Sequence, residues 1–288
     1  MVFALLAGVL IALTVGNPFG AHTSRVARTL LSLSVIGLGA GMDLRVVAVV
    51  GFHGLGYTAL TIGAALGLGV VLARVLRVPR TVAILISVGT AICGGSAIAA
   101  VAPAIGAGDE DTSIALVTVF LLNAIALVVF PLVGHVVGLG QADFGLWSAL
   151  AIHDTSSVVG AASHYGPQAL AVAAAAKLAR ALWIIPVTIA ASRLAPRGGP
   201  VAPAPRRPWF IAGFVVAAAL ATYVPSLTAI GQRVASLAHY TLGATLFLVG
   251  LGLTRPALKR LGARPLVMGV ALWLALASAT LAAIVGLR

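Results

Sequence analysis

The sequence predicts an all-α integral membrane protein with about ten transmembrane helices. Of its 288 residues, 61% are hydrophobic and 8% are charged, whereas a soluble globular chain carries about 25% charged residues. So little polar surface cannot cover a water-soluble particle of this size. Apolar segments long enough to cross a bilayer, about 20 residues each, recur along the whole chain. We therefore expect one polytopic transmembrane domain over residues 1–288.

Charged residues and prolines divide the chain into ten apolar segments. The predicted spans are residues 2–16, 26–42, 46–73, 81–105, 112–138, 144–163, 168–192, 209–227, 234–254 and 265–286. No basic residue precedes the first segment, and no Ala-x-Ala cleavage site follows it. We therefore expect a membrane segment there rather than a removable signal peptide.

The net charge of +12 comes from basic residues that gather in alternate loops. Thirteen fall on one side: Arg25, Arg28, Arg74, Arg77, Arg80, Arg193, Arg197, Arg206, Arg207, Arg255, Lys259, Arg260 and Arg264. Arg45, Arg233 and Arg288 fall on the other. The positive-inside rule places the thirteen, with the loop 193–208, in the cytoplasm and both termini outside. Basic residues spaced between apolar segments are an orientation signal, so we expect no nucleic-acid partner.

An equal division of the ten spans gives two halves, residues 1–140 and 141–288. The first half would start outside and the second inside. Inverted-topology repeats of this kind are common in secondary transporters, where the binding site lies between the repeats and uses interrupted helices at the bilayer midplane. We expect the same arrangement here.

Two basic residues, Lys177 and Arg180, fall inside the predicted span 168–192. At about 1.5 Å per residue they lie about 13 and 18 Å deep in a hydrocarbon core of about 30 Å. Each charge at that depth costs about 3 kcal/mol or more, and the spacing of three puts both on one helix face. They either snorkel or pair with Asp154, or they form a cationic pocket for an anion.

Five consecutive polar residues, 153–157, occupy the middle of the predicted span 144–163. In an intact helix they would face every side, so the helix is interrupted there or some of them line a cavity. Asp154 either neutralises one of the two buried cations, or it joins His153 in carrying a coupling proton or gating a pocket. The candidate binding hydroxyls follow: Thr155, Ser156 and Ser157.

A glycine pair, Gly94 and Gly95, lies at mid-depth in the predicted span 81–105. Its small polar neighbours are Thr90, Cys93 and Ser96. Small residues alone predict tight helix packing, but this combination also suits an unwound segment whose amides and half-helix N-terminus bind an anion. Asn123, about 16 Å into the next span, is either a neighbour of that site or an interhelical hydrogen-bonding residue.

The sequence lacks the motifs of disulfide-bonded, zinc-binding, ATP-binding and hydrolase proteins. One cysteine excludes an internal disulfide framework and a Cys-based zinc site, and no Walker loop, His-Glu-x-x-His or Gly-x-Ser-x-Gly motif is present. We therefore expect no metal site, no cofactor and no ATP-driven transport. An intramembrane enzyme using Ser156 or Ser157 is disfavoured, because adjacent positions on a helix point in different directions.

Four motifs carry a resemblance to a known family. They are residues 89–97 (GTAICGGSA), 151–162 (AIHDTSSVVGAA), 177–180 (KLAR), and 250–254 (GLGLT) with the trailing 259–265 (KRLGARP). In this order they resemble the YeiH-type sulfate exporter family, from about Leu10 to the C-terminus. The resemblance implies a bacterial inner-membrane secondary transporter of the bile-acid-symporter and sodium/proton-antiporter clan, with a core domain moving against a scaffold. By fold analogy alone, it also implies a homodimer with an elevator mechanism. In an inner membrane, the termini that the positive-inside rule places outside are periplasmic.

These observations favour an anion transporter that works by alternating access. Lys177 and Arg180 would attract sulfate, sulfite or a sulfonate, and the polar groups of the two mid-span motifs would bind its oxygens. Asp154 and His153 would couple transport to a proton or a sodium ion. The alternative is a cation/proton antiporter of the same architecture in which Asp154 binds the ion. A passive channel is disfavoured because no ring of repeated pore-lining residues is present.

Overall fold

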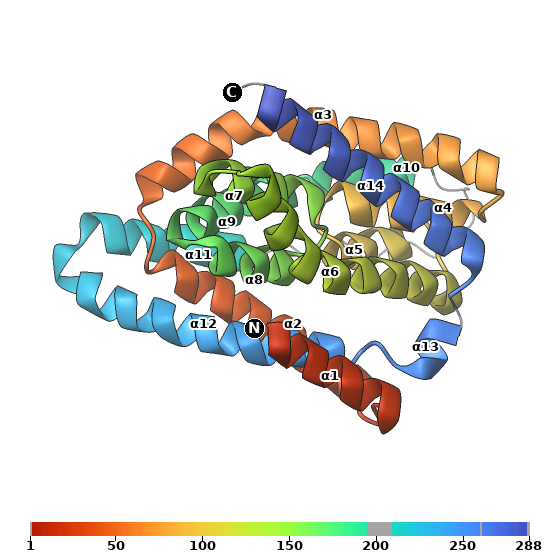
Figure 1. The fold of residues 1–288 in the computed structure, drawn as a ribbon, viewed down its shortest axis with the longest axis horizontal. Helices are drawn as coiled ribbons and strands as arrows, with labels where there is room; N and C mark the ends of the chain where they lie inside the picture. The colour runs from red at the N-terminus through yellow and green to blue at the C-terminus, as the bar shows by residue number, and fades with distance from the viewer. Residues whose placement is uncertain (1, 195–208, 260, 287–288) are drawn as a thin grey trace.

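The computed structural model describes residues 2–194, 209–259 and 261–286, so most of the predicted loop 193–208 lies outside the described residues. Within the described part the chain is all helical, without a strand, which confirms the predicted class (Figure 1). Its elements are α1 (Val2–Thr14), α2 (Gly20–Gly39), α3 (Leu44–Leu76), α4 (Arg80–Ala91), α5 (Gly95–Ala104), α6 (Asp109–Val137), α7 (Gln141–Ala151), α8 (Thr155–Tyr165), α9 (Pro167–Ala181), α10 (Ile184–Leu194), α11 (Trp209–Tyr223), η1 (Pro225–Leu227), α12 (Thr228–Gly250), α13 (Arg255–Lys259) and α14 (Ala263–Gly286).

Helices α1, α2, α11 and α12 form one group, which we call the outer bundle. Small residues let α2 and α12 approach closely, as in membrane helix pairs generally. A Cβ atom built on Gly37 would lie 2.8 Å from the Cβ of Ala238. The hydroxyls of Ser34 and Thr241 lie 2.6 Å apart across the same interface. Packing of small residues and a buried polar contact therefore hold the bundle together.

Helices α3 to α10 and α14 form the second group, which we call the core. Figure 1 shows α3 and α14 along one side of the molecule and α1 and α12 along the opposite side, with the shorter helices between them. An aromatic stack ties α6, α7 and α14 together: the ring of Phe130 lies 4.2 Å from that of Trp147 and 5.8 Å from that of Trp273, centroid to centroid. These contacts fasten α6, α7 and α14 to one another within the core.

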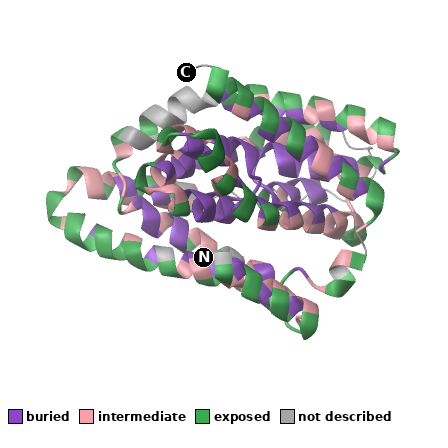
Figure 2. Cartoon of the chain, in the orientation of Figure 1, coloured by how far each residue is buried: buried purple, intermediate pink, exposed green. Residues whose placement is uncertain are grey.

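Burial follows the pattern of a protein that meets an apolar surrounding. Large apolar side chains point outward, among them Phe3 at 86% and Val136 at 87% exposure. Buried residues concentrate on the short central helices (Figure 2), and they include charged and polar groups such as Lys177 and Arg180, both 0% exposed. Lys177 and Arg180 are therefore enclosed in the core, while large apolar side chains lie on the exterior.

By length and composition, four helical stretches among the described residues could cross a membrane: Gly56–Leu76, Asp109–Val137, Pro167–Ala191 and Ala263–Gly286. The pair Ala212–Tyr223 and Pro225–Gly250, bent by 109°, brings the number to five if it is counted as one span. The other apolar helices are shorter than the roughly 20 residues that a crossing needs. The structure therefore establishes several candidate spans, and the ten predicted crossings stay a prediction.

Three predicted spans consist of two helices each. Residues 81–105 fold as α4 and α5, residues 144–163 as α7 and α8, and residues 168–192 as α9 and α10. The first two interruptions were predicted from their glycines and polar residues. The third, at Leu182 and Trp183, was not, because neither residue disfavours a helix strongly.

Several boundaries differ from the prediction because helices continue past their apolar stretches. Helix α2 begins at Gly20, so Arg25 lies in a helix rather than in the predicted loop, and Arg233 lies within α12 for the same reason. Arginine is a good helix former, so charge does not end a helix by itself. The interruptions at residues 92–94 and 152–154 also hold different places in the predicted halves: the first lies in the fourth span of residues 1–140, and the second lies in the first span of residues 141–288. The inverted repeat stays a prediction.

Candidate functional site

Two helical interruptions lie against each other in the core. The chain leaves the helical path at residues 92–94, between α4 and α5, and again at residues 152–154, between α7 and α8. A Cβ atom built on Gly94 would lie 3.5 Å from both the Cβ and the backbone nitrogen of Asp154. We call these two segments together the junction.

Each interruption has a local cause. Gly94 has φ 61° and ψ −122°, a backbone conformation that glycine adopts without the steric cost of a side chain. At the other interruption, Asp154 is extended, with φ −93° and ψ 145°, and its side chain accepts a hydrogen bond from the backbone N–H of Ser156 at 3.0 Å. Asp154 is therefore the N-cap of α8, and its negative charge complements the positive end of the helix dipole.

Asn123 on α6 fastens the second interruption. Its Oδ1 accepts hydrogen bonds from the backbone N–H groups of His153 and Asp154, at 3.1 Å each. Helix formation ends at Ala151, so these two amides depend on a side chain for a partner. The predicted neighbour of the glycine-rich segment is therefore a direct structural member of the junction.

Arg180 on α9 binds the C-terminal ends of both α4 and α7. Its Nε donates to the carbonyl oxygen of Ala91 at 2.6 Å, and its Nη2 donates to that of Thr90 at 3.2 Å. Its Nη1 donates to the carbonyl oxygens of Ala149, at 3.2 Å, and Leu150. One guanidinium thus connects two helix ends that are far apart in the sequence.

Lys177, one helical turn earlier on α9, binds the end of α7. Its Nζ donates to the carbonyl oxygen of Ile152 at 2.7 Å and approaches that of Ala149 at 3.4 Å. The last carbonyls of a helix have no intrahelical donor and carry the negative end of its dipole. Two buried cations therefore compensate two buried helix ends, which lowers the cost of placing charge inside the protein.

Asp154 does not neutralise these cations directly. In the described part of the chain its carboxylate accepts from the backbone and the hydroxyl of Ser156, and no ion pair joins it to Lys177 or Arg180. The structure therefore shows no direct ion pair between Asp154 and either basic residue. Snorkelling does not occur, because both basic side chains are 0% exposed.

Several polar atoms at the junction have no hydrogen-bond partner in the structure. They are Thr90 Oγ1, Asn123 Nδ2, and both ring nitrogens of His153. All three side chains are 1–2% exposed. A buried polar group without a partner costs about 1–3 kcal/mol, so their concentration at one place is unusual for a purely structural core.

The remaining predicted residues surround this group. Cys93, Gly94 and the first turn of α8, which holds Thr155, Ser156 and Ser157, are buried. Gly95 is half-buried and Ser96 is exposed, so the first turn of α5 reaches the surface. The structure thus brings the predicted residues together, with Ser96 at the outer edge.

The backbone carbonyls of residues 90, 91, 149, 150 and 152 belong to the site and were not predicted. Backbone groups are the same at every position, so they leave no signal in the sequence. The available signal was indirect: two cations one turn apart, beside two expected helix interruptions, imply unpaired carbonyls.

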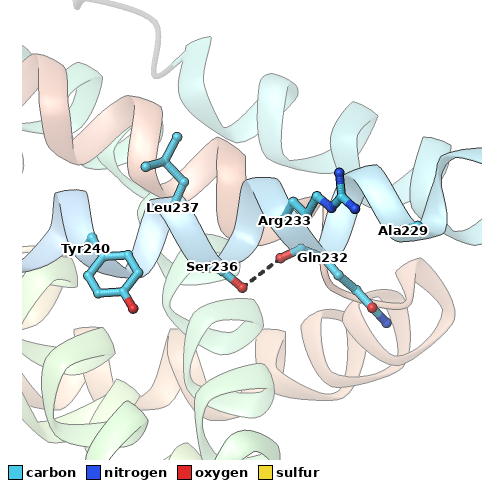
Figure 3. A pocket seen from close by; sticks show the side chains of 6 residues that line it. All are labelled: Ala229, Gln232, Arg233, Ser236, Leu237 and Tyr240. Atoms are coloured by element: carbon cyan, nitrogen blue, oxygen red, sulfur yellow. Dashed lines mark hydrogen bonds between the residues drawn. The ribbon is translucent and has the colours of Figure 1, made fainter.

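Two other features do not compete with the junction. Among the described residues, no group of three or more His, Cys, Asp or Glu side chains could hold a metal ion. Figure 3 shows a shallow hollow along one face of α12, lined by Ala229, Gln232, Arg233, Ser236, Leu237 and Tyr240. Its side chains come from a single helix and are exposed, and it is separate from the junction residues.

Comparisons with known proteins give a family but no tested activity. The model of a family described as "Conserved hypothetical protein 698" matches residues 1–269. A UPF0324 membrane protein of Bdellovibrio bacteriovorus is 53% identical over 284 residues, which cover 98% of this chain and 87% of that protein. UPF0324 membrane proteins of Geobacter sulfurreducens and Vibrio vulnificus are 47% and 45% identical, covering 98% and 96% of this chain and 89% and 90% of theirs. No solved structure matches.

Proposed function

Because the chain belongs to the UPF0324 family of membrane proteins, we propose that it is a secondary active transporter of a small anion. The substrate class is sulfate, sulfite or a sulfonate-like anion, moved across the bacterial inner membrane by alternating access. The chain then has ten crossings, each interrupted helix counting as one, and periplasmic termini. The names of its relatives state that they are membrane proteins and no more.

The contact between the two interruptions is the observation that supports transport. Irregular backbone at membrane depth is tolerated only where it is buried in protein or lines a water-filled cavity. Here the irregular segments touch, and they are held by Asn123, Lys177 and Arg180. Discontinuous helices of this kind form the ion and substrate sites of secondary transporters.

The charge of the junction supports an anion as the substrate. Lys177 and Arg180 contribute two formal positive charges, and Asp154 contributes one negative charge when ionised. The resulting excess of positive charge disfavours a cation and favours an anion, and the effect is strong in a medium of low dielectric constant. No enzymatic step is part of this proposal, and it needs no cofactor beyond a coupling proton or sodium ion.

The division into core and outer bundle supports a mechanism in which the core moves relative to the outer bundle. The two cations and both interruptions lie in the core, while the outer bundle packs mainly on itself. The core then moves against the outer bundle as against a scaffold, and homodimers that fix the scaffold complete an elevator mechanism. The clan relationship and the inverted repeat belong to this proposal.

A cation/proton antiporter is the second candidate, because Asp154 lies at the junction without an ion pair. In that case Asp154 binds the transported ion and Lys177 is its competing counter-charge. The two candidates differ in the sign of the substrate, so one flux assay separates them.

The test is transport by purified protein in liposomes. We expect saturable uptake of radiolabelled sulfate, inhibited by sulfite and by methanesulfonate, with a dependence on a proton or sodium gradient that identifies the coupling ion. The variant Asp154→Asn should lose the gradient dependence, while the exposed Arg233→Gln on α12 should transport like the wild type. Sodium-dependent proton flux that Asp154→Asn abolishes, without uptake of any of the three anions, would establish the antiporter instead.

A further inference from the structure

The cations predicted to bind the substrate are already engaged. Arg180 donates four hydrogen bonds to the ends of α4 and α7, and Lys177 donates to Ile152 and Ala149. These bonds leave at most one N–H group free on each of the two residues. Turning further donors toward an anion would leave buried carbonyl groups without partners, each at a cost of about 1–3 kcal/mol. Most direct ligands for an anion must therefore be sought elsewhere in the junction.

Asn123 presents a free donor at the right place. Its Oδ1 accepts from the backbone nitrogen of Asp154, and that nitrogen lies 3.5 Å from the Cβ position of Gly94. The amide group of Asn123 is therefore fixed beside both interruptions. Its Nδ2, on the same carbon as Oδ1, has no partner and is buried, and an amide nitrogen can only donate.

The N-terminus of α5 presents further donors at the same place. Its N-cap, Gly94, has no side chain to accept from the first amides of this ten-residue helix, whereas the N-cap of α8 is Asp154. The amide of Ala97 already donates to the sulfur of Cys93, so the amides of Gly95 and Ser96 remain for a ligand. The first amides of a helix have no intrahelical acceptor and carry the positive end of the dipole, which makes them an anion site. Gly95 is half-buried and Ser96 is exposed, so the first turn of α5 extends from the buried junction to the surface.

His153 is the third element. It precedes Asp154 in the junction, its backbone nitrogen is bonded to Asn123, and neither ring nitrogen has a partner. A neutral imidazole has one donor and one acceptor nitrogen. It can therefore donate to an oxyanion without adding charge.

We propose that a small oxyanion binds at the N-terminus of α5 through neutral donors, namely Asn123 Nδ2, the ring of His153 and the first amides of α5. Lys177 and Arg180 act at longer range, as counter-charges that offset the carboxylate of Asp154 on the same junction. This inference rests on the proposed function, since it assigns the transported anion to this site. Specificity then comes from the direction of hydrogen-bond donors rather than from a salt bridge.

The test is equilibrium binding of radiolabelled sulfate to the purified protein in detergent. Asn123→Asp keeps the size of the side chain and an oxygen acceptor for the two backbone amides, but it replaces the free donor by a negative charge. We expect its sulfate affinity to fall by about tenfold or more, as expected for losing a hydrogen bond to a charged group. His153→Leu should lose affinity similarly, and His153→Gln, which keeps an N–H donor, should lose less.

Thr188→Val is the matched control. Thr188 on α10 also has a buried hydroxyl without a partner, 3% exposed, but it lies outside the junction segments. Its removal should leave sulfate affinity unchanged. Thermal unfolding without ligand identifies any variant that fails to fold. If Asn123→Asp does not fold, the comparison of His153→Leu with His153→Gln tests the site.

The outcomes separate this site from the proposed function. If the wild type binds sulfate and folded Asn123→Asp and His153→Leu bind it equally well, the neutral-donor site is wrong and anion transport stands. If the folded wild type binds none of sulfate, sulfite and methanesulfonate, both are wrong. A selective loss in the junction variants, with Thr188→Val unaffected, supports the site.

Discussion

At the residue scale, the burial of the two basic residues of α9 was predictable from the sequence, but their hydrogen-bond acceptors were not. Their depth in an apolar segment predicted that Lys177 and Arg180 are buried, and both are 0% exposed. Their acceptors are main-chain carbonyls of α4 and α7, which no side-chain pattern reveals. The planar guanidinium of Arg180 suits this task, because its fixed fork of donors can reach two helix ends at once.

We predict that Arg180→Gln lowers the free energy of unfolding by about 3 kcal/mol, because it leaves several buried carbonyls without donors. Arg180→Lys should fall between this variant and the wild type, since one ammonium group cannot reach both helix ends. Thermal unfolding in detergent measures both. Arg233→Gln, an exposed change on α12, is the control, and an Arg180→Gln protein that unfolds at the wild-type temperature would contradict the role assigned to Arg180.

At the element scale, the interrupted helices place partial charges inside the core. The C-terminal ends of α4 and α7 meet the cations of α9, and the N-terminal end of α8 meets Asp154. At the N-terminal end of α5, the N-cap Gly94 has no side chain, and no charged group of the described residues caps this end. Charged side chains thus compensate the partial charges at the ends of α4, α7 and α8. The remaining end, the N-terminus of α5, is where a negatively charged ligand is stabilised most by the helix dipole.

Gly94 controls the geometry of that fourth end. With φ 61° and ψ −122°, and with Val119 Cγ1 3.2 Å and Asp154 Cβ 3.5 Å from a built Cβ atom, Gly94→Ala introduces backbone strain and a close contact. We predict a loss of about 1–3 kcal/mol in stability and a loss of sulfate binding. Thermal unfolding and the binding assay measure the two effects.

Gly108→Ala is the matched control for Gly94→Ala. Gly108 precedes α6 at φ −70° and ψ 163°, and a Cβ atom there meets nothing within 4 Å. This variant should unfold and bind sulfate like the wild type. Equal behaviour of the two glycine variants would show that the backbone at Gly94 does not shape the site.

At the scale of the whole molecule, function depends on whether the core and the outer bundle move relative to each other. They meet through apolar side chains in three places. Leu5 of α1 and Leu246 of α12 join the main core cluster, Val35 of α2 and Phe214 of α11 pack near Leu178 of α9, and Leu242 of α12 packs near Val159 of α8. Each group packs more extensively within itself than against the other. Such a boundary is typical of parts that move as rigid bodies.

We predict that cross-linking this boundary stops transport. In the variant with Leu31→Cys and Leu170→Cys, two half-buried positions packed against the cluster of Val159 and Leu242, a short bis-methanethiosulfonate reagent should reduce sulfate uptake to background, and dithiothreitol should restore it. The native Cys93 is buried, so the wild-type chain provides the background. Cysteines at Gly41, just after α2, and Ala235 of α12 are the control, because a Cβ atom built on Gly41 lies 2.7 Å from the Cβ of Ala235 and neither residue is buried: cross-linking there should leave uptake intact. If sulfate uptake continues when the core and the outer bundle are cross-linked to each other, transport does not require their relative motion.

The sequence alone determined the class of the protein and most of its polar centre. Composition and apolar segments predicted an all-helical membrane protein, and residues 153–157 with the Gly94–Gly95 pair predicted where helices break, because polar runs and glycines disfavour an uninterrupted apolar helix. Only the tertiary structure decided what these groups bind. A buried backbone carbonyl or amide without a hydrogen-bond partner costs free energy. The packing of α4, α7 and α9 brings the carbonyls of the helix ends next to Lys177 and Arg180. The same packing left the donor of Asn123 free.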